Sequence, residues 1–157
     1  WWRIKMVGEA ATEIHDAAGR AIGKYKRYKF RRKVEDSPLE AVDDPVAAAI
    51  VMMYAIAQDA GPAMPRVDEA VRHEVTRSMG VRDATEVLVF GKWVAGHAAD
   101  PNNVSLRYAK LWTGSLDPAE RLAFLGMVER VAEAAGPVTD AQRAILAKLR
   151  DRLGLAG

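Results

Sequence analysis

Apolar residues recur at helical spacing in two pairs of segments that follow one plan, over residues 44–80 and 117–154. Each pair begins with Asp-Pro, breaks at Ala-Gly-Pro and ends with a glycine followed by an apolar residue. The two glycines lie 19 residues apart in the first pair and 18 residues apart in the second. The shared plan predicts two duplicated helical hairpins that bury their apolar faces against each other.

Capping signals mark the helix ends in these pairs. Asp117 is a good N-cap, Pro118 suits the first helical position, and Glu120 completes a capping box. Thr139 and Gln142 form a second capping box. The apolar faces predicted for the first pair hold Ile50, Met53, Tyr54, Ala57, Val67, Val71, Val75 and Met79, and those for the second hold Leu122, Leu125, Val128, Val131, Ala135, Ile145, Leu146, Leu149 and Leu153.

Three further helices are expected outside the pairs. Asp83 and Glu86 are expected to cap a helix that runs to Ala98, and a loop over 99–103 then leads to a shorter helix over 104–112. Residues 4–32 read as one alanine-rich amphipathic helix. These helices bring the total to about seven with no strand, so the predicted fold class is an all-α helical bundle. Three aromatic residues are assigned to its core: Phe90, Trp93 and Trp112.

Length and composition favour one globular domain. The chain has 157 residues, half of them apolar, and no cysteine, which excludes disulfide scaffolds, zinc ribbons and thiol nucleophiles. The longest uncharged run, from Pro45 to Gln58, has 14 residues and is too short for a membrane span. We therefore divide the chain into an N-terminal helix (1–33), an acidic linker (34–43) and a helical domain (44–157).

Charge is distributed unevenly along the chain. Residues 1–33 contain ten Lys/Arg and three Asp/Glu, a balance of +7, whereas residues 34–157 contain 13 and 18, a balance of −5. The excess is concentrated in the segment from Lys24 to Lys33, which has seven basic residues, three aromatic residues and no acid. Basic and aromatic residues in alternation suit an anionic surface. The predicted binding residues are Lys24, Tyr25, Lys26, Arg27, Tyr28, Lys29, Arg31, Arg32 and Lys33.

Three interpretations of this basic segment stay open. It docks on an anionic membrane surface or a partner protein; it binds nucleic acid; or it is a solvated helix end followed by an ordinary linker. No catalytic motif accompanies it: the sequence has no G-x-S-x-G, no phosphate-binding glycine loop and no H-E-x-x-H. We therefore predict a non-enzymatic protein without a cofactor, with a divergent enzyme as a third, weaker hypothesis.

The two pairs resemble the TerB-like family, named for bacterial tellurite-resistance proteins and found also in a membrane-anchored DnaJ-like co-chaperone. The resemblance covers roughly 43–155 and rests on the Ala-rich turns Ala57–Gly61 and Ala132–Gly136, the cap at Thr139 and the closing Leu153–Leu155. It implies an all-helical, non-enzymatic, cytoplasmic module at the inner face of the membrane, linked to tellurite or metal stress. The family also has an acidic face proposed to bind divalent metal.

The chain departs from the family pattern where a metal would bind. The family's aspartate before the glycine is Ala60 in one pair and Ala135 in the other, and its glutamate is Gln142 in the second. An oxygen-ligand site needs several converging carboxylates. We therefore predict no metal site; the acids that remain near the motif are Asp59, Asp68 and Glu69.

Overall fold

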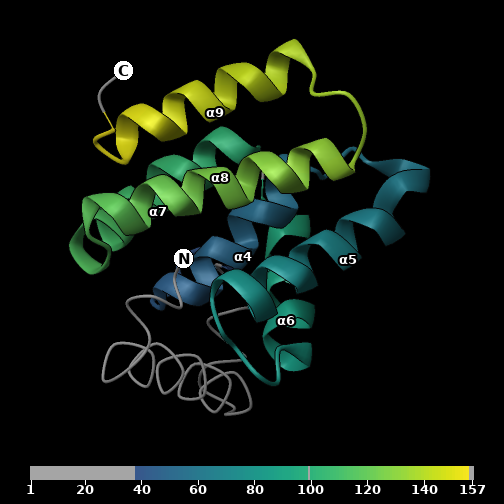
Figure 1. The fold of residues 1–157 in the computed structure, drawn as a ribbon, viewed down its shortest axis with the longest axis horizontal. Helices are drawn as coiled ribbons and strands as arrows, with labels where there is room; N and C mark the ends of the chain where they lie inside the picture. Colours follow the sequence, from purple (N-terminus) through teal and green to yellow (C-terminus); the bar gives the residue numbers. More distant parts are fainter. Residues whose placement is uncertain (1–37, 99, 156–157) are drawn as a thin grey trace.

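The computed structural model describes residues 38–98 and 100–155, and every regular element in this part of the chain is helical (Figure 1). The predicted all-α bundle is thus confirmed for the described residues. The helix expected over 4–32 lies outside them, so the count of about seven stays a prediction. The elements are α4 (Pro45–Ile56), η1 (Gly61–Ala63), α5 (Met64–His73), η2 (Glu74–Ser78), α6 (Thr85–Gly96), α7 (Pro101–Ser115), α8 (Pro118–Ala134) and α9 (Asp140–Arg152).

Helix α4 is the centre of the bundle. Every residue of α4 after Pro45 is buried, and α5, α6, α7 and α8 all pack against it. A helix that is apolar on all sides is stable only when neighbours enclose it. Residues 46–57 of the uncharged run, all of them buried, therefore form the centre of the core. None of the helices described is long and apolar enough to cross a membrane.

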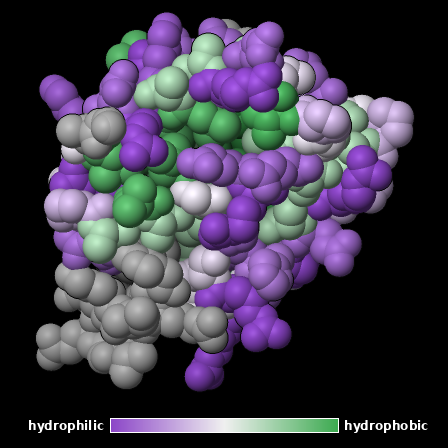
Figure 2. Space-filling model, turned by 45° about the horizontal axis from the view of Figure 1, so that its top comes forward, coloured by the Kyte–Doolittle hydropathy of each residue, from purple (hydrophilic) through white to green (hydrophobic). Residues whose placement is uncertain are grey.

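The outermost helix, α9, packs on α7 and α8 at the top of Figure 1. Only Leu149 and Leu153 of its predicted apolar face are fully buried, while Ile145 and Leu146 are half-buried against the core. On the face that carries α9, hydrophobic surface gathers in a hollow between bands of hydrophilic side chains (Figure 2). The last helix thus covers the core only in part.

Capping explains where most helices begin. Asp44 accepts a hydrogen bond of 2.6 Å from the Val46 N–H, and the predicted capping boxes of α8 and α9 are both present. The cap predicted for α6 is wrong: the N-cap is Ala84, and Asp83 precedes it. Val87 and Leu88 are buried against the core, so packing determines where α6 starts without a side-chain cap.

Helix α7 is longer than predicted at both ends. The loop expected over 99–103 ends at Asp100, which caps the helix by accepting from the Asn103 N–H at 2.9 Å. Pro101 is already helical, and the helix continues through 113–115, where the sequence suggested a turn. The Asp-Pro pair that opens α4 and α8 also opens α7, so the signal was present in the sequence.

The segment that follows α5 contains a π-helical turn, η2. The Met79 N–H donates to the Glu74 carbonyl at 3.0 Å, and the Val81 N–H donates to the Val75 carbonyl at 3.1 Å. A π turn accommodates one more residue than an α turn. Gly80 then takes a φ of +71°, which favours glycine.

Two apolar residues that the sequence assigns to the core or to an apolar face are exposed, and Phe90, also assigned to the core, is only partly buried against it. Trp112 is fully buried and contacts Phe124 at a ring-centroid distance of 4.7 Å, as expected for the core. Trp93 was also assigned to the core, but it is 39% exposed and its ring lies 4.3 Å from that of His97. Leu122 is 53% exposed, because it lies on the outer side of α8. Periodicity alone does not distinguish the edge of an apolar face from its centre.

The described part of the predicted linker, 38–43, packs on the bundle. Ala41 and Val42 are buried, and the Tyr108 hydroxyl donates to the Leu39 carbonyl at 2.7 Å. Burial raises the pKa of Tyr108 well above its usual value, so the hydroxyl remains a donor. This contact attaches the start of the described chain to α7.

Candidate functional site

The predicted binding residues, Lys24–Lys33, lie outside the described residues. The three motif acids lie within the described part. Asp68 and Glu69 line one pocket and Asp59 lines another, so the structure does not bring the three together.

A pocket between α5 and α6, here called the α5–α6 pocket, brings charged side chains together with an apolar wall. Its volume is about 410 Å³, and α4, α5 and α6 all contribute to it. At its base the Tyr54 hydroxyl donates to Asp68 Oδ1 at 2.9 Å. Lys92 Nζ donates to the two oxygens of Asp68 at 3.0 and 3.1 Å. Three helices are therefore joined at one carboxylate.

Tyr54 is a fixed neutral donor in this cluster. Its side chain is buried, and it supplies the single polar group in α4. Burial, followed by the hydrogen bond to Asp68 and the charge of that carboxylate, raises the pKa of Tyr54 well above its usual value, against the opposing charge of Arg72. Lys92 Nζ also lies 5.8 Å from the centre of the Tyr54 ring, within range of a cation–π contact.

The rim of the α5–α6 pocket carries opposite charges beside apolar groups. Glu69 and Arg72 are exposed on α5, while Leu88 and Val89 of α6 form the apolar side. Val89 is 66% exposed, the largest exposed fraction among the large apolar residues described. Counting Asp68 and Lys92, the lining has two negative and two positive side chains. Such a lining suits a ligand with both charges and an apolar part.

A second concavity, here called the loop pocket, lies where the breaks of the two predicted hairpins meet. It has a volume of about 220 Å³ and is lined by Asp59 and Ala60 from one break and Ala135 and Pro137 from the other. Gln142 donates from its side-chain amide to the Ile56 carbonyl at 2.9 Å. Its polar groups thus serve the contact between α9 and the end of α4.

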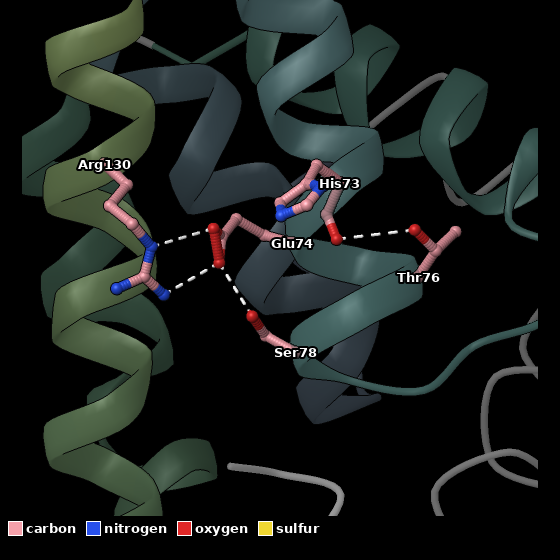
Figure 3. Close-up of polar contacts among 5 residues, drawn as sticks. All are labelled: His73, Glu74, Thr76, Ser78 and Arg130. Atoms are coloured by element: carbon pink, nitrogen blue, oxygen red, sulfur yellow. Dashed lines mark hydrogen bonds and ion pairs between the residues drawn. The ribbon is translucent and has the colours of Figure 1, made fainter.

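An ion pair between α8 and the π turn has a buried carboxylate (Figure 3). Arg130 donates to Glu74 through Nε at 2.8 Å and through Nη2 at 2.7 Å, and the Ser78 hydroxyl donates to Glu74 at 2.7 Å. The Glu74 side chain is 4% exposed and that of Arg130 is 54% exposed. Burial opposes ionisation of Glu74, but these hydrogen bonds and the Arg130 charge outweigh it and lower the pKa of Glu74.

The described residues hold no group of three or more His, Asp or Glu side chains placed to bind a metal ion. Asp68 is already bound to Tyr54 and Lys92, and Asp59 lies in the separate loop pocket. We expect calorimetry to show no micromolar binding of Ca²⁺, Mg²⁺ or Zn²⁺. Micromolar binding that disappears in a variant with Asp59→Ala, Asp68→Ala and Glu69→Ala would contradict this prediction.

Sequence reasoning missed two features that the structure brings together. Tyr54 was assigned to the apolar face, yet it is the single residue of Pro45–Ile56 with a polar side chain, and that is the signal for a polar contact at this point. Glu74 lies three residues after Val71, at a position where the helical pattern expects an apolar residue. An acid at such a position indicates a buried partner. No comparable signal marks Lys92 or Arg130, because exposed cations are common on helices.

Comparisons of this chain with protein-family models, with curated proteins and with solved structures give no match.

Proposed function

We propose that the chain is a non-enzymatic interaction module whose basic segment, Lys24–Lys33, docks on an anionic membrane surface. The observation that carries the proposal is the composition of this segment, seven Lys or Arg and three aromatic residues in ten with no acid. Clustered positive charge repels itself, and an anionic surface neutralises it. Near an anionic leaflet each Lys or Arg contributes about 1 kcal/mol.

The rest of the chain supports a division of roles. Residues 34–157 carry a balance of −5, so an anionic surface attracts the basic segment and repels the remainder. Every residue of α4 after Pro45 is buried, which fits a role of the bundle as the scaffold that carries the segment. In this arrangement the segment holds the bundle at the inner face of the membrane, where it is available to a protein partner.

We propose also that the bundle is TerB-like and that 44–80 and 117–154 are duplicated hairpins. The glycines that end the two pairs, Gly80 and Gly154, both have a φ of +71°, and the residue after each donates its N–H back into the preceding helix. The π turn accounts for the extra residue in the first pair. The first helices of the two pairs, α4 and α8, pack against each other. A link to tellurite or metal stress rests on the family resemblance.

The docking proposal predicts a large loss of vesicle binding when the basic segment is neutralised. In a variant with Lys26, Arg27, Arg31 and Arg32 replaced by Gln, we expect affinity for phosphatidylserine-containing vesicles to fall roughly a thousandfold, because four contributions of about 1 kcal/mol are removed. Far-ultraviolet circular dichroism and the melting temperature should change little. Vesicle sedimentation at two salt concentrations measures the effect.

A matched control removes the same charge from the bundle. The control residues form no side-chain ion pair among the described residues: Arg77, Lys110, Lys148 and Arg150. Replacing all four by Gln should leave vesicle binding nearly unchanged. Equal losses in both variants would show that net charge alone matters and would contradict docking by the segment. If the unsubstituted protein does not bind vesicles at low salt but binds short single-stranded DNA with a steep salt dependence, the function is nucleic-acid binding.

A further inference from the structure

We infer that the α5–α6 pocket is a binding site for a small zwitterion with an apolar side chain, the chemistry of an apolar α-amino acid. The site lies in the bundle and does not depend on the basic segment. Its volume of about 410 Å³ falls within the size range of small-molecule sites, roughly 300–1,000 Å³. The inference rests on which charged side chains of the pocket already form an ion pair with each other and which do not.

Two of the four charged side chains neutralise each other. Asp68 receives Lys92 through both oxygens, at 3.0 and 3.1 Å, and the Tyr54 hydroxyl fixes one of those oxygens at 2.9 Å. Tyr54 is buried in α4, so this carboxylate cannot move away without losing a donor held by the core. The cluster forms a fixed, charge-balanced base of the pocket. A ligand is then recognised by the groups that remain.

The groups that remain are one cation and one anion on α5. Arg72 lies one helical turn after Asp68, the spacing of an i,i+4 ion pair, but Asp68 is bound to Lys92 instead. Neither Arg72 nor Glu69 forms an ion pair among the described residues. Arg72 can bind a carboxylate with two parallel hydrogen bonds, and Glu69 can accept from an ammonium group. A zwitterion satisfies both charges at once.

The wall opposite the charges suits an apolar side chain. Leu88 and Val89 line the pocket from α6, and Val89 is 66% exposed. An aliphatic group placed on Val89 removes that apolar surface from water, at about 25 cal/mol per Å² buried. The carboxylate, the ammonium group and the aliphatic side chain of an apolar amino acid therefore each have a counterpart in the pocket.

The test uses the full chain and L-leucine as the probe, with amide chemical-shift changes and calorimetry as readouts. We expect saturable binding with a dissociation constant below about 10 mM. The amide chemical shifts that change should belong to residues of α5 and α6. Glycine lacks the side chain, leucinamide lacks the carboxylate and N-acetyl-leucine lacks the ammonium group. Each should bind about tenfold more weakly, because each leaves one part of the pocket without its counterpart. No saturable binding of L-leucine would overturn the inference.

Variants assign the two charged contacts. Arg72→Gln should lower the affinity for L-leucine about tenfold and leave the already low affinity for leucinamide unchanged. Glu69→Gln should lower the affinity for L-leucine and leave that for N-acetyl-leucine unchanged. Arg77→Gln, an exposed arginine outside the pocket, is the matched control and should bind as the parent does. N-acetyl-leucine binding as tightly as L-leucine would overturn the zwitterion in favour of a simple carboxylate. Equal effects of Arg72→Gln and Arg77→Gln would overturn the site.

Discussion

Replacing Arg130 by Met is expected to destabilise the protein by about 2–3 kcal/mol at pH 7, because it leaves the Glu74 carboxylate buried without its cation. Glu74 is 4% exposed, and Arg130 supplies two of the three hydrogen bonds to its side chain that Figure 3 shows. The apolar stem of Met keeps most of the packing of Arg130. Denaturant unfolding at pH 7 measures the loss.

The effect of this substitution should depend on pH in a defined direction. In the parent, the lowered pKa of Glu74 means that the pair stabilises the fold at neutral pH and that this contribution is lost as the pH falls through that lowered pKa. In Arg130→Met the Ser78 hydrogen bond to Glu74 remains, but without Arg130 the burial of the carboxyl should outweigh it and raise the pKa of Glu74, so protonation stabilises the variant as the pH falls. The difference between the two proteins should therefore shrink steadily from pH 7 towards pH 3.

Two further variants keep this prediction open to contradiction. Arg143 pairs with Asp140 on the surface, where both side chains are largely exposed, and Arg143→Met should cost less than about 1 kcal/mol with little pH dependence. Replacing the buried pair together, with Glu74→Leu and Arg130→Met, should restore much of the stability lost by Arg130→Met alone. A cost for Arg130→Met that matches the surface control at pH 7 would show that the pair does not stabilise the fold.

Replacing Gly91 by Ala is expected to destabilise the protein by about 1–2 kcal/mol, although alanine is the better helix former. A Cβ at this position would lie 2.5 Å from Ile50 Cγ2 and 3.1 Å from Ile50 Cβ. Ile50 is fully buried in α4, so it has little room to move. The glycine is what allows α6 to approach the central helix closely. Thermal and denaturant unfolding measure the change.

The same helix supplies the control. A Cβ at Gly96 has no heavy atom within 4 Å, so Gly96→Ala should leave stability unchanged or raise it by up to about 1 kcal/mol. In an Ile50→Ala background the clash is absent, and Gly91→Ala should cost much less than it does in the parent. An equal cost of Gly91→Ala in both backgrounds would show that contact with Ile50 is not the cause.

The sequence by itself determined the fold class of the described region and where α4, α8 and α9 begin. Its signals are local: Asp-Pro and Thr caps, glycines that end helices and apolar residues at a 3.6-residue period all act within a few residues. The capping boxes at Asp117 and Thr139 were accordingly predicted correctly. The uncharged run 45–58 was also recognised in the sequence. Its place at the centre of the bundle was not predicted, because periodicity within one helix does not show which other helices pack against it.

Only the tertiary structure decided which side chains meet. The clusters Tyr54–Asp68–Lys92 and Glu74–Ser78–Arg130 join residues up to 56 positions apart, and no local pattern predicts such pairs. Tertiary packing also placed Trp93 at the surface and started α6 without a side-chain cap, against the sequence-based expectation. Local free energies of capping and helix propensity are near 1 kcal/mol and act within one helix. Which groups are buried together depends on how the helices pack around α4, a property of the whole chain.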